Sequence, residues 1–368
     1  MPLTKIELRP GLNREGTDYS NSGGWFDGDK IRFRSGFPEK LGGWSRLSDN
    51  SFLGVARSLW NWIDLDGSNY VGIGTNLKYY IEKGGQYYDI TPIRKTVNPM
   101  AANPFSTSYS TLNGTIDSTQ TTITLTSTAS FPAGPVIIQI GTEQIYATSK
   151  SGSTLTGLIR GYNSTTAATH SSGAAVGCST ITVTDVSNGS TQNDFVTFSG
   201  ATAFGGFSTA NINAEQQITF ELSTSQYLIN ISGVFSTSAT SGGGAAVIAQ
   251  YQILTGLDVY VIGTGWGAGP WGRGGWGSGY TSGIGEQLRL WTADNFGQDL
   301  VLAPRGGSIY YWKDSTGVST RAQLLSTLAT GAGYSGQFVP TATNWIVSSD
   351  IQRFVIAFGA NPYRSEEH

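Results

Sequence analysis

The fold is most constrained by a run of short aromatic strands separated by tight turns. Residues 53–91 contain an aromatic strand ending at Trp62, a polar turn at 64–68, and a Gly-Gly turn at 84–85 before the last strand. Asp and Gly favour such turns because they hydrogen-bond their own backbone or adopt left-handed conformations. The segment therefore predicts a four-stranded antiparallel meander.

The same order of strands and turns returns later in the chain. In residues 288–314, Trp291 precedes a turn at 294–297, and the aromatic strand at 308–313 parallels the one at 77–82. A third, shorter unit carries apolar residues on one face of its last strand, namely Phe354, Ile356 and Phe358. Repeated meanders with aromatic landmarks are typical of β-propeller blades, which bury their faces against one another.

The composition favours strands over helices. Of the 368 residues, 50 are glycine, 12% are aromatic and only 13% are charged, which is typical of many turns joining β-strands. We therefore predict an all-β fold. It would be a β-propeller-like platform of antiparallel blades with inserted small β-barrel or sandwich modules.

A different composition separates the aromatic units. Residues 98–256 are rich in Thr, Ser, Gly and Ala. This segment predicts short strands at 122–126, 136–140, 144–148, 154–159, 180–184, 195–199, 217–221, 226–231 and 246–253. Residues 104–107 look like the first strand of a module that resumes at 178, so one module is expected to interrupt another. The predicted domains are an N-terminal segment with the first blades (1–97), an inserted module (98–108 plus 178–256), a nested module (109–177), and a Gly/Trp-rich loop with further blades (257–368).

A basic stretch lies between two Gly-Gly-Trp sequences near the N-terminus, which contain Trp25 and Trp44. Residues 36–38 are expected to end its strand. Alternation along a strand predicts two faces, with Lys30, Arg32 and Arg34 on one and Ile31 and Phe33 on the other. This row fits either a half-solvated strand or an anion site. The near-neutral chain favours a strand that anchors the N-terminal segment to a blade or a neighbouring subunit.

The most unusual segment is a glycine-rich loop at 263–285. It spaces three tryptophans five residues apart and also contains an arginine: Trp266, Trp271, Arg273 and Trp276. Glycine lets the backbone turn freely, while each indole offers a large contact surface. The loop is expected to pack either onto its own platform or against another subunit or a pore.

Residues for catalysis or metal binding are scarce. The two histidines are His170, in a Thr/Ser-rich turn, and His368, the last residue, which are poor positions for a Ser-His-Asp triad. The single Cys178 excludes a disulfide within the chain and is expected to be buried. Residues 64–67 lack the 12-residue ligand spacing of a calcium loop. We expect no catalytic residues, no metal and no cofactor.

The net charge and the hydropathy limit the kinds of partner that the chain is expected to bind. The 22 basic and 25 acidic residues give a net charge of −3, which excludes a globally basic nucleic-acid binder. No apolar run approaches the length of a membrane span, and the first ten residues lack a signal-peptide core. We expect a soluble protein made in a cytoplasm, with no membrane insertion.

Several segments together resemble virion structural proteins of tailed bacteriophages. The resemblance is carried by residues 10–17, 23–27, 30–34, 38–44, 89–94, 194–201 and 265–277. Within that group, the blade pattern is similar to the nozzle or hub proteins of short tails. The resemblance implies a virion location and a homo-oligomer, a hexameric ring that forms the distal DNA channel. It would have a tail adaptor above it and fibres or a needle attached.

The role implied by this resemblance needs packing surfaces rather than an active site. A channel should avoid tight phosphate binding, because each paired cation would slow the passage of DNA. The candidate subunit or adaptor contacts are Trp25, Lys30, Arg32, Arg34, Trp44, Trp266, Trp271, Arg273 and Trp276. The sequence departs from the family in having too few blades for a closed propeller. Either the blade count is wrong or the chain is the front part of a longer protein.

Two other functions stay open. The Ser/Thr-rich modules at 109–256 fit a receptor-binding or fibre-attachment protein that binds host surface glycan. A tail-associated glycan depolymerase is the third alternative, because paired carboxylates meet only in the folded protein.

Overall fold

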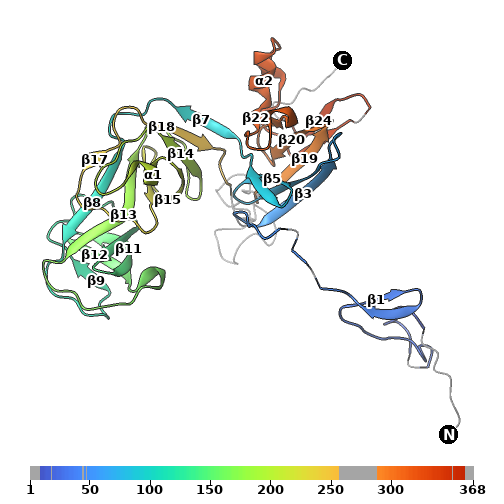
Figure 1. The fold of residues 1–368 in the computed structure, drawn as a ribbon, viewed down its shortest axis with the longest axis horizontal. Coiled ribbons are helices and arrows are strands. Elements are labelled where there is room, and N and C mark those ends of the chain that lie inside the picture. Colours follow the sequence, from blue (N-terminus) through green and yellow to red (C-terminus); the bar gives the residue numbers. More distant parts are fainter. Residues whose placement is uncertain are drawn as a thin grey trace, which may run out of the picture. The chain divides into compact units, whose positions relative to one another are not determined.

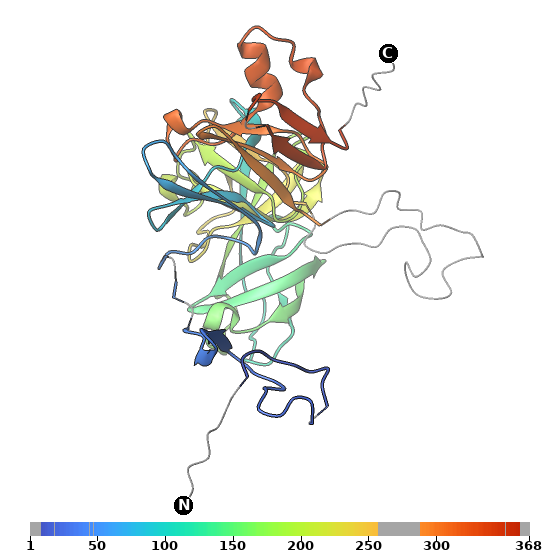
Figure 2. The same ribbon diagram turned by 90° about the vertical axis from the view of Figure 1, so that its right-hand side faces the viewer.

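The computed structural model confirms the all-β class, with only short helices. It describes residues 9–17, 19–43, 45–46, 48–256, 288–349 and 351–360. The chain divides into two compact units, one ending at Asp49 and the other starting at Asn50, and each is described by itself. Figures 1 and 2 show the strands of both units.

The N-terminal unit contains one antiparallel hairpin, β1 (Ile31–Arg34) and β2 (Phe37–Lys40). Its turn is Ser35-Gly36, and both residues have positive φ, 49° and 87°. Such two-residue turns match the right-handed twist of the strands that they join. Residues 36–38 were expected to end the strand. The strand does end at Arg34 and Gly36 lies in the turn, but Phe37 and Pro38 already belong to β2 because the turn is completed at Gly36.

The second unit begins with the predicted four-stranded meander, which is confirmed. Its strands, in sheet order, are β3 (Ala56–Ile63), β4 (Asn69–Thr75), β5 (Tyr79–Lys83) and β6 (Gln86–Asp89). In the first turn, the Asp64 N–H donates to Ser68 O (2.9 Å) and Gly67 has a φ of +84°. The Asp64 and Asp66 side chains accept local backbone N–H bonds, as expected for turn aspartates.

A second meander forms from residues 291–324, with strands β19 (Trp291–Phe296), β20 (Asp299–Pro304), β21 (Tyr310–Trp312) and β22 (Gln323–Leu324). The turn predicted at 294–297 is wrong. The strand continues through Phe296 because Asp294 accepts the Ser348 N–H (2.7 Å) instead of bonding its own backbone. Gly297 takes the positive φ of the turn, 70°. A helix, α2 (Leu325–Gly331), follows β22.

The third group of strands expected from the sequence forms a two-stranded hairpin within the second unit, β23 (Trp345–Ser348) and β24 (Val355–Phe358). Its inward face includes Ile346, which is buried, while Val355 and Ala357 are partly buried. The face with Phe354, Ile356 and Phe358, expected as one apolar face, points away from this core and is exposed.

Aromatic side chains hold the first and second blades together. Trp62 stacks on Tyr70 with ring centroids 5.2 Å apart, and Trp312 packs edge-on against both rings. The Trp291 indole N–H donates to Thr75 O (2.7 Å), across the two blades. This core holds one blade on the other mainly through its large apolar area, since the buried indole N–H groups of Trp60 and Trp312 have no hydrogen-bond partner among the described residues.

The second blade is covered on both faces. On β20, Leu300 and Leu302 pack toward the first blade, whereas Val301 and Ala303 pack toward the β23–β24 hairpin. Figure 2 shows the blades in series, from β3 (blue) through β19 and β20 (orange) to the hairpin (red). The described residues therefore contain two blades and a hairpin in a stack, which is too few sheets for a closed propeller.

The Thr/Ser-rich insertion leaves and rejoins the blades through two paired strands, β7 (Ile93–Val97) and β18 (Ile248–Gln252). Between them lie β8 (Phe105–Thr111), β9 (Thr122–Thr124), β10 (Val136–Ile140), β11 (Glu143–Ser151), β12 (Thr154–Ile159), β13 (Ala175–Thr184), β14 (Phe195–Ser199), α1 (Thr209–Ile212), β15 (Glu215–Ser223), β16 (Gln226–Asn230) and β17 (Ser241–Gly242). Three of these strands, β10, β12 and β14, have the predicted bounds.

The strands of the insertion form one sheet path around two cores. The long strand β13 joins them, because Ile181 and Val183 belong to one core whereas Val176 and Cys178 belong to the other. Strand β8 follows it: Phe105 pairs with Val183 and Tyr109 pairs with Gly177. No closed barrel forms among the described residues, and the shared strand β13 links the two cores into one sheet.

We predict that residues 109–177 can be removed without unfolding the rest. Tyr109 and Gly177 are paired neighbours, so an Asn-Gly turn can join Ser108 to Cys178. The other hydrophobic cores keep all their residues. When urea unfolding is monitored by tryptophan fluorescence, the deletion variant should therefore have the same midpoint as the parent chain. Aggregation of this deletion would contradict the prediction. As the matched control, removal of residues 195–252 takes most of the other core and should abolish folding.

Candidate interaction surfaces

The predicted basic row does not form as a row of three free cations. Lys30 has a φ of +56° and precedes β1, so it does not share the extended backbone of the strand. Arg32 forms an ion pair with Glu39, its partner in the β1–β2 register. Lys30 and Arg34 are exposed. Across the hairpin the cation is thus matched by a carboxylate, which weakens any attraction for a polyanion.

The opposite face of the hairpin carries the packing. Phe33 meets Trp25 edge-on, with ring centroids 6.2 Å apart, and Leu12 forms a backbone bridge with Trp25. However, no described residue of the N-terminal unit is buried, and the side chains of Phe26 and Phe37 are exposed. A unit of this size normally needs a core or a partner surface to be stable.

The other candidate contacts, Trp44, Trp266, Trp271, Arg273 and Trp276, lie outside the described residues.

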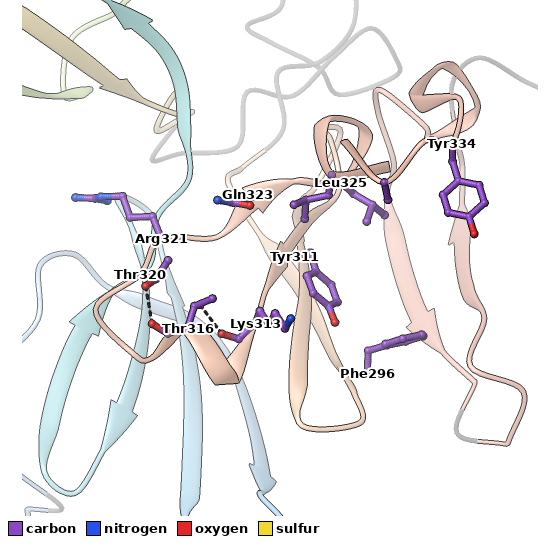
Figure 3. A pocket seen from close by; sticks show the side chains of 11 residues that line it. Phe296, Tyr311, Lys313, Thr316, Thr320, Arg321, Gln323, Leu325 and Tyr334 are labelled. Atoms are coloured by element: carbon purple, nitrogen blue, oxygen red, sulfur yellow. Dashed lines mark hydrogen bonds between the residues drawn. The ribbon is translucent and has the colours of Figure 1, made fainter. Parts of the chain in front are cut away.

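Within the described part, a cavity of about 690 Å³ opens beside the second blade (Figure 3). Most of its exposed lining is apolar and comes from residues that include Phe296, Tyr311 and Leu325, while Lys313 and Arg321 also line it. The apolar lining suits a partner side chain better than a charged ligand. The sequence did not predict this cavity.

A buried charge cluster joins the insertion to both blades. Lys78, almost fully buried, lies 2.7 Å from Asp89 Oδ2 and forms a second ion pair with Glu215 of β15. Arg321, just before β22, lies 3.2 Å from each carboxylate, and the Gln252 amide also donates to Glu215. Burial opposes the charge of Asp89, but Lys78 and Arg321 hold its pKa below the ordinary value. Two cations balance two carboxylates, so the cluster is structural.

A second buried cluster lies in residues 109–177. Glu143 is fully buried and accepts two bonds from Arg160, 2.7 and 2.8 Å, and one from His170 Nε2 at 2.7 Å. Burial disfavours its charge, yet these bonds and the N–H groups of Ala168 and Gly161 outweigh burial and lower the pKa of Glu143 to about 2. No serine or threonine hydroxyl bonds His170 among the described residues, so this carboxylate-histidine pair is a structural contact.

The Glu143 pKa predicts an acid-dependent loss of stability. Its folded pKa lies below the unfolded value of 4.5, so its contribution is fully present above that value. The contribution is lost as the pH falls toward about 2, by about 3 kcal/mol in all. Calorimetric unfolding of the whole chain across this range should show the decline. A Glu143→Gln variant should show a flatter pH dependence, and equal slopes would contradict the prediction.

Neither cluster was predicted from the sequence. Lys78 and Glu215 are separated by 137 positions, whereas Arg160 and His170 lie 17 and 27 positions from Glu143 and meet it only when β11, β12 and the following turns have formed. Cys178 is buried as expected, and burial raises the pKa of its thiol to about 12. Within the described part of the chain, no group of three His, Cys, Asp or Glu residues could hold a metal ion. No described helix is long and apolar enough to cross a membrane.

Comparisons with known proteins give little further guidance. No protein-family model matches the chain, and no curated protein matches it. Among solved structures, the phage phi92 endosialidase is similar at a TM-score of 0.18 and 11% sequence identity, over 80% of this chain. The chain spans about 42% of the length of that protein. Similarity at this level does not define a shared fold, so the function must be argued from the residues of this chain.

Proposed function

We propose that this chain is a structural protein of a bacteriophage tail, a nozzle or hub ring that forms the distal DNA channel and carries fibres or a needle. The sequence resemblance to virion proteins supports the phage context. The blades support a packing role, since each sheet buries its faces against the next. In this proposal the protein is not an enzyme, and it needs no cofactor.

The observation that carries the proposal is the N-terminal unit. Its described residues pack Trp25 against Phe33 but bury no side chain fully. Exposed Phe26 and Phe37 would gain stability by docking on a neighbouring subunit or on the tail adaptor. A chain whose first unit lacks a core of its own fits a component that is completed by assembly.

The charge arrangement agrees with a channel through which DNA slides. Arg32 is paired with Glu39, and Lys78 and Arg321 are balanced by carboxylates. Each cation that is already paired contributes little to phosphate binding. The proposal therefore expects weak DNA affinity that depends only slightly on added salt, because few phosphates would be neutralised.

Electron microscopy of intact particles tests the proposal. We expect a hexameric ring of this chain around the tail axis, below the adaptor, with the N-terminal unit against a neighbouring chain. A peripheral trimer, or a position away from the axis, would contradict it. As a second readout, antibodies raised against the purified chain should label the tail tip of intact particles and not their heads.

A second candidate function, glycan binding, is favoured by one observation. A cavity of about 620 Å³ lies across the two parts of the insertion and is lined by hydroxyl and amide groups, including Ser106, Ser130, Thr182, Gln226 and Thr240. Such groups hydrogen-bond sugar hydroxyls. A glycan array with the whole chain should then show binding that Thr182→Trp removes, since the indole would fill the cavity. No binding by the parent chain would exclude this candidate.

A further inference from the structure

The blade stack ends in an exposed apolar face on the β23–β24 hairpin. Trp345 and Phe358 lie directly opposite each other in the register and are 56% and 52% exposed. Val347 and Ile356 form the next exposed pair on the same face. The other face of the hairpin packs on the second blade through Ile346. The hairpin is thus packed on one side and open on the other.

The opposite end of the stack carries a second exposed apolar face, on β3 of the first blade. Alternation along β3 points Trp60 and Trp62 toward the second blade. Leu59 and Ile63 therefore point away from it, and they are 68% and 67% exposed. Asn61 lies between them on this outward face. Within β3, β23 and β24, the partly buried Arg57 is the one charged side chain on these outward faces. Glu82 of β5 lies on the same face of the first blade as Asn61, but it is buried.

The two exposed faces occupy equivalent places in the stack. The first strand is β3 in the first blade, β19 in the second blade and β23 in the hairpin. Strand β19 packs against β3 on one side and against β23 on the other. The exposed apolar residues fall on the two outer members of this series. A face whose exposed side chains are mostly large and apolar fits another sheet face rather than DNA or an acidic surface.

We propose that the β23–β24 face of one copy packs on the β3 face of a second copy, so that the blade stack continues from subunit to subunit. The two faces differ, so the contact is head-to-tail, and such contacts close into rings when the rotation allows. Trp345 and Phe358 then meet Leu59 and Ile63 as the blades within one chain meet through Trp62 and Trp312. This inference rests on the proposed ring and names its contact.

Paired blocking variants test the proposal. Leu59→Lys blocks only the β3 face, and Ile356→Lys blocks only the hairpin face; both side chains are exposed, so the fold should tolerate them. By light scattering after size exclusion, we expect the parent chain to form oligomers and each variant to be a monomer. An equimolar mixture should form a heterodimer and stop there, because each variant keeps one intact face of the pair.

Controls make the outcome decisive. Leu65→Lys, at an 89% exposed turn position away from both faces, should assemble like the parent chain, and circular dichroism should show unchanged strand content in all variants. A monomeric parent chain, or a mixture that stays monomeric, would overturn the proposal. So would hydrogen exchange that finds both faces protected in a monomer, since another part of the chain would then cover them. A ring in the particle together with a monomer in solution would overturn this contact alone and leave the proposed function standing.

Discussion

Replacing Glu143 by glutamine should destabilise the 109–177 part of the chain by about 3–5 kcal/mol, the usual cost of breaking a buried ion pair. Glutamine has nearly the same shape, so the effect isolates the charge. Arg160 would keep its own charge in a site where its guanidinium is almost fully buried. In addition, one amide oxygen cannot accept all the N–H groups that now point at the two carboxylate oxygens.

The measurement must observe this part of the chain directly, because none of the ten tryptophans lies within residues 109–177. Hydrogen exchange with mass spectrometry on peptides from β10 to β12 should show faster exchange in the variant, while blade peptides keep their parent rates. The matched control is Glu221→Gln on β15, an exposed glutamate, which should change stability by less than about 0.5 kcal/mol. Unchanged exchange in β10 to β12 would show that the ion pair is dispensable.

Replacing Lys78 by methionine should destabilise the junction of the insertion and the blades by about 3 kcal/mol. Methionine keeps the apolar part of the side chain but removes the ammonium group, which lies 4.5 Å from the centroid of the Phe195 ring. The carboxylates of Asp89 and Glu215 would then share Arg321 alone, which leaves one negative charge uncompensated in a largely buried site. The loss is expected to loosen the insertion before the blades themselves unfold.

Tryptophan fluorescence in urea reports on this region, since Trp62, Trp291 and Trp312 form the nearby blade core. The variant should show a lower midpoint or a separate early transition. Lys30→Met, at a highly exposed lysine of the N-terminal unit, serves as the matched control and should leave the midpoint unchanged. A Lys78→Met midpoint equal to that of the parent chain would contradict a stabilising role for the cluster.

The short strands could be predicted from the sequence because apolar and polar residues alternate along a strand and because turns favour particular residues. The turn at Asp64–Ser68 and the two meanders formed as predicted, since their hydrogen bonds are local and their turn residues favour the required backbone. The turn expected at 294–297 failed for a tertiary reason. Asp294 bonds the backbone of β23, which lies more than 50 positions away in the sequence.

The candidate contact residues were likewise predicted only in part. The sequence placed Phe33 on an apolar face, and the structure packs it on Trp25. It did not reveal that Arg32 would be neutralised, because the pairing with Glu39 depends on the register set by the Ser35-Gly36 turn. Nor did it reveal the cavity beside α2, which is lined by residues from separate elements.

By itself, then, the sequence determined the all-β class, the strand positions of the insertion and the repeated blades, because these follow from residue alternation and local turn chemistry. Only the tertiary structure decided which charges are buried together and which apolar faces stay open. Lys78 meets Glu215 through packing of distant segments, and Glu143 meets Arg160 and His170 through the pairing of β11 with β12 and the turns that follow. Phe358 and Leu59 look like core residues in the sequence, but they are exposed because the stack presents no further sheet face to cover them.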